Sequence, residues 1–463
     1  MKTAKKKLFR IQMEGDIYTP IGIFQSLTGS KKFLLESSLK HEQHGRFSFI
    51  GSTPFMELKA NGDHLVELTP DGNIEERSGR FLDAMKEYLP TEVEKNMPFP
   101  FLGGAVGFVG YDLIRQYEDI GPMLHDEMEM PEAHLMFYRE VIVYDHINQQ
   151  ISIVMLGEED EEEAFTKRAN SIKSMIEQGP AEVTTSQHEK KKIDFQSNMT
   201  KQHFQDLVLK AKEEIVKGEI FQVVLSQRFS ADFSGDSFQF YRSLRRHNPS
   251  PYMFYIEFSD YQIVGSSPES LLKGDGVNVI TNPIAGTRKR GVTAEEDQQL
   301  EIELLQDEKE LAEHRMLVDL GRNDLGRVCE IGTVTLTKYM LIEKYKRVMH
   351  IVSEVTGKKL SSVSNADVLA SCLPAGTVSG APKIRAMSII NELETVKRNV
   401  YAGAVGYFSV HGSFDFALAI RTMVVKDGRA HIQTGAGIVY DSDPEMEYQE
   451  VFNKARALME VEI

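Results

Sequence analysis

Two separated segments of the chain each carry a pair of glutamates three residues apart on a predicted helix. They are Glu310 and Glu313 in DEKELAEHRMLVDLGRND, and Glu447 and Glu450 in PEMEYQEVFNKARAL. Residues at i and i+3 lie on one face of a helix, so four carboxylates converge if the two faces meet. Such an oxygen-rich set suits a hard divalent cation such as Mg²⁺, whose shell an acidic substrate could complete. The alternative is that both pairs lie on solvated helix surfaces.

Two loops could bring backbone groups to an anion near such a cation. In PIAGTRKRG a strand end is followed by a turn, where Gly286 permits close backbone approach and Thr287 offers a hydroxyl group. The basic tail of this segment could instead be a solvated turn. LPAGTVSGAPKIRAM joins a loop rich in glycine and serine to a helix that starts near Ala381 and Pro382. The free N–H groups of a helix start can bind an anion.

A third glycine-containing segment and a lone arginine extend this set. TGAGIVY, which contains Gly435, Ala436 and Gly437, lacks the third glycine of a dinucleotide-binding loop, and no helix is predicted after it. We expect its backbone N–H groups to face a carboxylate. Arg421 lies in the otherwise apolar strand segment AIRTM. A buried arginine must find an anion, which is either an internal carboxylate or a bound one.

Composition excludes several classes of partner. The chain has 463 residues and a net charge of −16, which argues against nucleic acid or an anionic membrane as a partner. No stretch approaches the ~20 apolar residues of a membrane span. The basic segment MKTAKKKLFR is followed by IQMEGD without an apolar run, so we expect no signal peptide. Cys329 and Cys372 form no disulfide framework, which predicts a cytoplasmic protein. Tryptophan is absent.

The order of predicted elements indicates an α+β fold. Predicted strands come in runs with glycine-containing turns, which favours antiparallel sheets with helices outside over strict βαβ alternation. The run FLGGAVGFVGYD is best explained by close strand packing. A polar stretch that ends near residue 192 predicts a linker, and thus an N-terminal part, 1–190, and a second part, 191–463. The helices expected in the second part are 202–219, 294–320, 364–372, 380–394 and 444–460.

Taken together, these segments resemble the chorismate-utilising enzymes, and among them the anthranilate synthase component I family. The likeness covers nearly the whole chain and is dense from about Phe195 to Ala457. The matching segments, in order, are EIFQVVLSQ, NPSPYMF, VGSSPES, PIAGTRKRG, DEKELAEHRMLVDLGRND, VMHIVS, GTVSGAPKIRAM, GAVGYF, AIRTM and TGAGIVYDSDPEMEYQEVFNKARA. The resemblance implies a sandwich of antiparallel sheets packed face to face with helices outside, and a Mg²⁺-dependent lyase that acts on chorismate.

The resemblance also assigns roles to residues of this chain. Glu313 and Glu450 match magnesium ligands, supported by Glu310 and Glu447, and the metal would hold the ring carboxylate of chorismate. The positions that match substrate contacts are Gly286, Thr287, Tyr401, Arg421, Gly435, Ala436, Gly437 and Lys454. The positions grouped as catalytic are His350 in VMHIVS, Glu269 in SSPES, Gln222 in the strand, and Thr377 in the glycine-rich loop. Glu269 matches the glutamate proposed to protonate the departing C4 hydroxyl group.

Two positions discriminate between activities within the family. Relatives that add water to C2 of chorismate carry a lysine where this chain has Gln222, because water needs a general base and ammonia does not. Relatives that make 4-amino-4-deoxychorismate commonly have PIKGT, whose lysine can attack the ring covalently. The corresponding residue here is Ala285. Both positions predict amination at C2, loss of pyruvate and formation of anthranilate. 4-Amino-4-deoxychorismate synthase component I and a non-catalytic sensor on the same fold remain the alternatives.

The resemblance further implies regulation and a partner. LLES and NPSPYMF match the segments that form a feedback site for tryptophan in relatives, with Ser37, Glu36, Pro251, Tyr252 and Met253 as the matching contacts. The alternative for LLES is a buried strand without a regulatory role. The chain has no GxCLGxQ-like nucleophile segment, so we expect ammonia from a separate glutamine amidotransferase subunit, and hence a hetero-oligomer.

Overall fold

A computed structural model describes residues 7–37, 45–89, 98–180, 192–345 and 348–462. The expected linker largely falls in 181–191, outside the described residues, as do the first six residues of the basic N-terminal segment. The division near residue 190 therefore stays a prediction. Strands from both sides of it pair within each sheet, for example β2 with β13 and β7 with β21.

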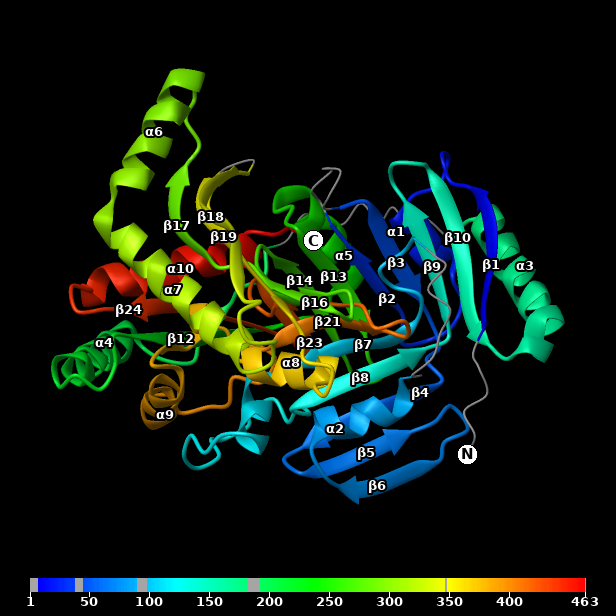
Figure 1. The fold of residues 1–463 in the computed structure, drawn as a ribbon, viewed down its shortest axis with the longest axis horizontal. Helices are drawn as coiled ribbons and strands as arrows, with labels where there is room; N and C mark the ends of the chain where they lie inside the picture. The colour runs from blue at the N-terminus through cyan, green and yellow to red at the C-terminus, as the bar shows by residue number, and fades with distance from the viewer. Residues whose placement is uncertain (1–6, 38–44, 90–97, 181–191, 346–347, 463) are drawn as a thin grey trace.

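Two antiparallel sheets of twelve strands each form the framework (Figure 1). The first sheet has, in spatial order, β1 (Lys7–Glu14), β10 (Gln150–Gly157), β9 (Glu140–Asp145), β3 (Phe47–Gly51), β2 (Phe33–Glu36), β13 (Tyr252–Glu257), β14 (Tyr261–Ser267), β23 (Thr422–Lys426), β24 (Arg429–Ile438), β12 (Gln222–Asp232) and β11 (Gln196–Ser197), with β20 (Gly380–Ala381) paired to β12. The second has β17 (Ile284–Lys289), β19 (Val348–Lys358), β16 (Asn278–Thr281), β15 (Ser270–Gly274), β22 (Phe414–Leu418), β21 (Ala404–Ser409), β7 (Gly104–Val109), β8 (Ala133–Tyr138), β4 (Met56–Asn61), β5 (His64–Leu68) and β6 (Ile74–Ser78), with β18 (Thr335–Lys344) paired to β19.

Helices cover the outer face of each sheet. Those whose apolar residues join the core over the first sheet are α1 (Pro20–Ser26), α3 (Glu162–Gln178), α4 (Lys201–Val216), α5 (Ser237–His247), α9 (Lys383–Leu393) and α10 (Pro444–Met459). Those over the second sheet are α2 (Phe81–Met85), η2 (Tyr111–Gln116), α7 (Glu308–Gly326) and α8 (Asn365–Cys372). The remaining elements are η1 (Lys86–Tyr88), η3 (Glu159–Glu161), α6 (Ala294–Gln306) and η4 (Gly376–Val378). The predicted α+β sandwich is confirmed.

Aromatic rings make many of the contacts in the space between the two sheets. Phe33 of the first sheet contacts Tyr138 of the second with ring centroids 4.7 Å apart, and Phe101 contacts Tyr407 at 4.6 Å. Rings in such contacts add stabilisation beyond the area they bury. Glycines allow neighbouring strands to pack this tightly. A Cβ on Gly107 would lie 2.0 Å from the backbone oxygen of His134, which confirms strand packing as the reason for the glycine-rich run.

Three predicted element boundaries were wrong, each for a local reason. The expected helix 294–320 is two helices, because Asp307 leaves the helical conformation and caps α7 by accepting hydrogen bonds from the N–H groups of Lys309 and Glu310. The expected helix at 380 begins at Lys383, because Gly380 and Ala381 pair with β12 instead. PIAGTRKRG is mostly the strand β17 rather than a turn.

A buried ion pair connects η4 and β12, two elements that carry predicted site residues. Arg398 and Glu394 are both almost completely buried, and the guanidinium NH2 lies 2.6 Å from Glu394 Oε1. The carboxylate also accepts hydrogen bonds from the N–H and hydroxyl groups of Ser226 on β12. Arg398 in turn donates to the carbonyl oxygens of Val378 in η4 and Val224 in β12, each at 2.7 Å. The pair therefore fixes η4 against β12.

No described helix is both long and apolar enough to cross a bilayer. Cys329 and Cys372 are both buried free thiols.

We expect Glu394→Gln to lower the free energy of unfolding by about 3–5 kcal/mol, because it leaves the buried Arg398 guanidinium without a countercharge. Urea denaturation followed by circular dichroism measures the change. Glu392→Gln is the matched control, since Glu392 is exposed and forms a surface ion pair with Arg385. Its effect should stay within about 0.5 kcal/mol. Equal stability of the two variants would show that the buried pair does not hold the fold.

Candidate active site

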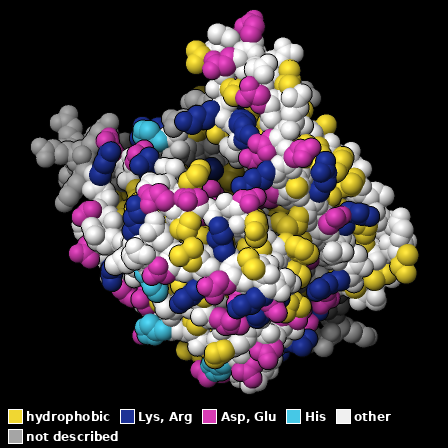
Figure 2. All heavy atoms as spheres, turned by 90° about the vertical axis from the view of Figure 1, so that its left-hand side faces the viewer, with side chains coloured by type: hydrophobic (Ala, Val, Ile, Leu, Met, Phe, Trp, Pro, Cys, Tyr) yellow, Lys and Arg dark blue, Asp and Glu magenta, His cyan; other side chains and the backbone are white. Residues whose placement is uncertain are grey.

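The predicted site residues gather where α7 and α10 meet the ends of strands from both sheets. In Figure 1, α6 and β17 project from one end of the molecule, with α7 and α10 at the base of this projection. Figure 2 shows the same end of the molecule, where the surface is hollowed beside the base of the projection and Lys and Arg side chains are interspersed with Asp and Glu. The site thus lies at one edge of the sandwich, between the two sheets.

Carboxylates from α7 and α10 influence one another across the site. Burial, together with the negative charges of Glu310 and Glu450, raises the pKa of Glu313, although Gln222 donates a hydrogen bond to it at 3.2 Å. Burial and the charge of Glu450 likewise raise the pKa of Glu447. In such surroundings an unpaired carboxylate is unfavourable, and a bound cation would stabilise its charged form. The donor set therefore fits a hard divalent metal ion.

Two of these four carboxylates are paired with protein cations in the structure. Glu310 lies 3.1 Å from Arg288, and Glu450 lies 2.7 Å from Lys454. Within the described part of the chain, no group of three or more His, Cys, Asp or Glu side chains is arranged to hold a metal ion. The assignment of Glu313, Glu450, Glu310 and Glu447 as metal ligands stays a prediction. The basic tail of β17 is not a simple solvated turn, because Arg288 pairs with Glu310 and also with Asp307, the latter at 2.6 Å.

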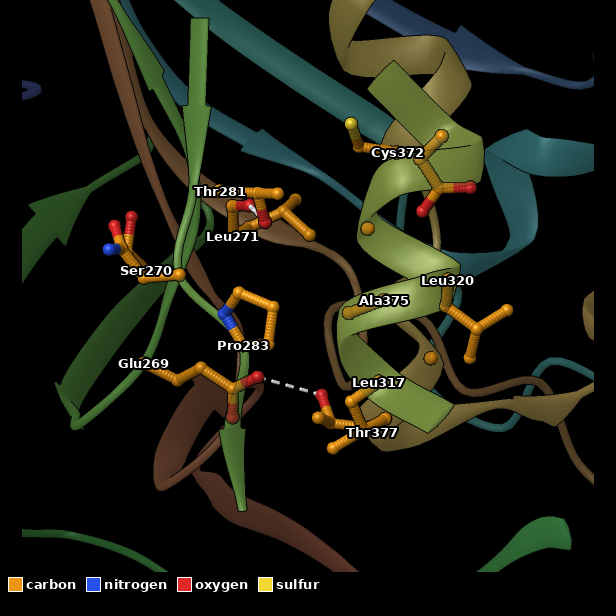
Figure 3. Close-up of a pocket in the computed structure, with 14 residues that line it drawn as sticks. Glu269, Ser270, Leu271, Thr281, Pro283, Leu317, Leu320, Cys372, Ala375 and Thr377 are labelled. Carbon is orange, nitrogen blue, oxygen red and sulfur yellow. Dashed lines mark hydrogen bonds between the residues drawn. The ribbon is translucent and has the colours of Figure 1, made fainter. Parts of the chain in front are cut away.

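Glu269 lies between β14 and β15, and its surroundings favour the protonated form of its carboxyl group. Its side chain is partly buried, and this burial raises the pKa of the carboxyl group to about 7, while a hydrogen bond from Thr377 and the charges of Lys454 and Arg421 act in the opposite direction. The Thr377 hydroxyl donates to Glu269 Oε1 at 2.8 Å (Figure 3). A carboxyl group with a pKa near neutral pH exists in part as the acid, which is the form that can protonate a leaving group.

His350 is held with one nitrogen toward the protein and the other left available. Its Nδ1 lies 3.1 Å from the carbonyl oxygen of Gly286 and 3.0 Å from the Thr287 hydroxyl oxygen. A carbonyl oxygen only accepts, so Nδ1 carries the proton and Nε2 carries the lone pair. Burial lowers the pKa of this imidazole, which favours the neutral ring. Gly286 adopts φ +76°, and the register of β17 against β19 is irregular there.

Arg421 has the properties of an anion-binding residue. It lies immediately before β23, not within a strand as predicted, and adopts φ +48°, which is rare outside glycine. Burial lowers its pKa, and the charge of Glu269 opposes this effect. Among the described residues, none forms an ion pair or hydrogen bond with its guanidinium group. A desolvated guanidinium without a partner favours a bound carboxylate.

The glycines of β24 let three polar side chains approach its backbone. A Cβ on Gly437 would lie 2.6 Å from Gln222 Nε2, and one on Gly435 would lie 2.8 Å from the Tyr401 hydroxyl oxygen. Lys454 donates to the carbonyl oxygen of Gly435 at 2.9 Å. On one edge this stretch of β24 pairs with β12, whereas on the other edge β23 pairs with it only up to Ile432. The second edge thus has no paired strand beside the glycines.

The residues expected to bind tryptophan lie at a different place in the first sheet. Glu36 on β2 pairs in register with Met253 on β13. Its carboxylate accepts hydrogen bonds from Tyr241 at 2.6 Å and Arg245 at 3.0 Å, so it is already engaged. By contrast, the buried Ser37 hydroxyl oxygen has no hydrogen-bond partner among the described residues. Pro251 directly precedes β13, and Tyr252 donates to Asp415 at 3.0 Å.

Sequence reasoning missed the residues that support the site from behind. Glu394 and Arg398 fix η4, which carries Thr377, and the guanidinium of Arg398 also lies 5.6 Å from the ring centroid of Tyr401. A cluster of charges in an otherwise apolar context, NELETVKR, was the signal that could have indicated a buried pair. Its two members are spaced i and i+4, as in a surface helix pair, so spacing alone favours the wrong interpretation.

Known proteins of one family resemble this chain over most of its length. The family described as chorismate binding enzyme matches residues 31–460. The chain belongs to this family of chorismate-binding enzymes. It is 46% identical over 462 residues to anthranilate synthase component 1 of Acetivibrio thermocellus, covering 97% of this chain and 94% of the relative. It is 43% identical over 456 residues to the protein of that name from Lactococcus lactis, covering 97% and 98%.

A solved structure agrees with these relatives. The crystal structure of anthranilate synthase component I from Streptococcus pneumoniae matches with a TM-score of 0.82 at 42% identity, covering 96% of this chain and 98% of that one. The resemblance drawn from the sequence is confirmed, and so is the expectation that this chorismate-binding protein is an enzyme. The individual roles of the site residues stay predictions.

We expect Thr377→Val to shift the alkaline limb of the pH profile of kcat/KM to higher pH by roughly one unit. The hydrogen bond from Thr377 favours the charged carboxylate and lowers the pKa of Glu269, so its loss raises that pKa and the acid form persists to higher pH. Initial rates with chorismate from about pH 6 to 9 measure the shift. Thr281→Val is the control, because Thr281 lines a cavity that Glu269 and Thr377 also line, but its hydroxyl group donates to the carbonyl oxygen of Leu271. A profile that stays in place for Thr377→Val would remove Glu269 as the titrating acid.

Proposed function

We propose that the chain is the synthase subunit of anthranilate synthase. It would add ammonia to C2 of chorismate with loss of the C4 hydroxyl group, and then eliminate pyruvate to give anthranilate. The names of the relatives at 46% and 43% identity support this activity. Within the site, the surroundings of Gln222 carry the proposal, because they favour ammonia over water as the nucleophile.

Gln222 is buried at the start of β12 and has one unused hydrogen-bonding group. Its Nε2 donates to Glu313, whereas its Oε1 has no hydrogen-bond partner among the described residues. An amide oxygen can accept an N–H of ammonia but is far too weak a base to activate water. The relatives that use water carry a lysine here according to the resemblance, so this chain lacks the base which that reaction needs.

Ala285 supports the same choice. It lies on β17 opposite Ile351 and directly before the strand irregularity at Gly286. Its methyl group cannot attack the ring, so no covalent intermediate forms at this position. This disfavours 4-amino-4-deoxychorismate synthase component I. A non-catalytic sensor on this fold is disfavoured by Glu269 and His350, whose burial and protonation fit proton transfer and are not needed for binding alone.

The geometry suggests how the chain's own residues would act on chorismate. Arg421 and the unpaired edge of β24 would bind the enolpyruvyl carboxylate, with the Tyr401 hydroxyl nearby. Glu269 in its acid form would protonate the departing C4 hydroxyl group, so that the C–O bond breaks and water leaves. His350 presents a lone pair on Nε2, which suits it to accept a proton when pyruvate is eliminated and the ring becomes aromatic.

Magnesium is the cofactor that fits the carboxylates of α7 and α10. Glu313 and Glu450 would hold it, with Glu310 and Glu447 in support. Bound Mg²⁺ would neutralise and orient the ring carboxylate of the substrate. Lys454 would then be released from Glu450 and remain near the substrate carboxylates. Glutamine-dependent activity would require a separate amidotransferase subunit that supplies ammonia.

We expect the protein with chorismate, Mg²⁺ and ammonium to form anthranilate and pyruvate in equal amounts. Fluorescence and mass spectrometry identify the products. Glu313→Gln and Glu450→Gln should each lower kcat/KM by at least about a hundredfold, because the ring carboxylate is no longer neutralised.

Glu308→Gln is the matched control, since Glu308 lies on the same helix α7 but outside the predicted set, and it should keep wild-type activity. Isochorismate or 4-amino-4-deoxychorismate as the product would contradict the proposal. So would full activity in excess EDTA.

Feedback inhibition by tryptophan is the regulatory part of the proposal. The contacts of β13 with β14 support it, because they connect the expected tryptophan residues to the site. Tyr252 pairs in register with Ser267, whose hydroxyl oxygen accepts a hydrogen bond from the N–H of Glu269 at 3.3 Å. Met253 pairs with Ser266, whose N–H donates to the backbone oxygen of Arg421 at 3.1 Å. A shift of β13 would therefore displace both residues.

We expect tryptophan to bind beside Ser37 and to weaken chorismate binding by ~1–3 kcal/mol, with a reciprocal effect of chorismate on tryptophan. Calorimetric titration and inhibition kinetics measure the two effects. Ser37→Arg and Met253→Thr should make the enzyme less sensitive to tryptophan while uninhibited kcat stays largely intact. Ser30→Arg, in the exposed loop before β2, is the control and should remain inhibited. If the wild type binds no tryptophan at millimolar concentration, the pocket is only structural.

A further inference from the structure

A cavity beside Glu269 is lined by residues other than the predicted substrate contacts. It measures about 40 Å³ and is lined by Glu269, Thr377 and residues of α7 and α8, and Figure 3 shows Cys372 at the end opposite Glu269. On this measure one water needs roughly 10–15 Å³, so the cavity has room for a small number of waters. Arg421, Tyr401, Lys454 and the β24 glycines do not line it. We call it the inner cavity.

A wider cavity at the surface lies behind the same wall. It measures about 340 Å³, and its lining includes Arg327, Leu373 and Lys383. We call it the outer cavity. Two neighbouring residues of the chain divide the two spaces, since Cys372 lines the inner cavity and Leu373 the outer one. An ion pair also lies between the two cavities. Asp324 lines the inner cavity and Lys383 lines the outer one, and their charged groups lie 2.7 Å apart.

The proposed reaction leaves Glu269 in need of a proton. When the acid protonates the departing hydroxyl group, the C4–O bond breaks with its electron pair on oxygen, water leaves and a buried carboxylate remains. The ammonium group formed at C2 loses its extra proton on the substrate side, so the overall reaction neither gains nor loses protons. The substrate side of Glu269 is filled by the reacting ring, whereas the inner cavity can hold water against its other side.

We propose that the inner cavity, the Asp324–Lys383 pair and the outer cavity form a water passage that returns a proton to Glu269 after each turnover. The inference rests on the proposed role of Glu269 as the acid. Asp324 and Lys383 act through water and are positioning residues. The pair is largely buried, with 12% and 11% of the two side chains exposed, and carboxylate and ammonium groups can both form hydrogen bonds with water. Rotation of the Lys383 side chain toward the outer cavity would join the two spaces.

The test uses the full-length protein with chorismate, Mg²⁺ and saturating ammonium, in H₂O and in D₂O. Asp324→Asn weakens the relay, and Ala375→Leu fills the inner cavity while leaving the ion pair intact. Both should lower kcat roughly tenfold or more with an unchanged KM for chorismate, and both should increase the solvent isotope effect on kcat, because proton return becomes rate-limiting. A merely structural defect would not increase that isotope effect.

Two matched controls should keep wild-type kcat. Asp319→Asn changes an exposed carboxylate of the same helix, and Ala370→Leu adds the same bulk to the wider outer cavity. If Asp324→Asn fails to fold, Ala375→Leu decides the question. Wild-type kcat and isotope effect in Ala375→Leu would overturn the passage, as would an effect confined to the KM for ammonium. If the wild type forms no anthranilate, the proposed function itself fails, which is a separate outcome.

Discussion

The candidate site depends on one buried ion pair. Arg398 and Glu394 lie away from solvent, where either charge alone would be strongly unfavourable. Their hydrogen bonds reach β12 through Ser226 and Val224 and reach η4 through Val378. These elements carry Gln222 and Thr377, which come from distant parts of the chain. Loss of either member of the pair would disturb both residues together, so the pair acts as a positional reference for the site.

Burial sets the protonation of the site, and opposite charges restrain its effect. The same low-polarity surroundings raise the pKa of Glu269 and Glu313 and lower those of His350 and Arg421. Each shift favours the form that the proposed chemistry uses or increases affinity for an ion of opposite charge. A substrate with two carboxylates and a divalent cation would therefore supply charges opposite to those of these groups.

Regular patterns in the sequence predicted the antiparallel sheets and most helices, and the order of the family segments indicated the family. Glycine-rich strands, amphipathic helices and the order of family segments all lie in local sequence. Features that depend on distant contacts were not predictable in this way. Asp307 interrupts a helix that periodicity extends, and Arg421 lies outside the strand that its apolar neighbours suggested. The ion pair of Asp324 and Lys383, which separates the inner cavity from the outer cavity, forms only when α7 and α9 pack around the same loop.

The interleaving of strands has a consequence for how the chain is made. In the first sheet, β14 pairs with β23, and β12 pairs with β24, although more than 150 residues separate the members of each pair. The ribosome thus releases almost the whole polypeptide before either sheet can close. Until then the edges of β12 and β14 are open to pairing with other chains, and closing such large loops is slow. Production of active protein therefore depends on the folding environment as well as on the site.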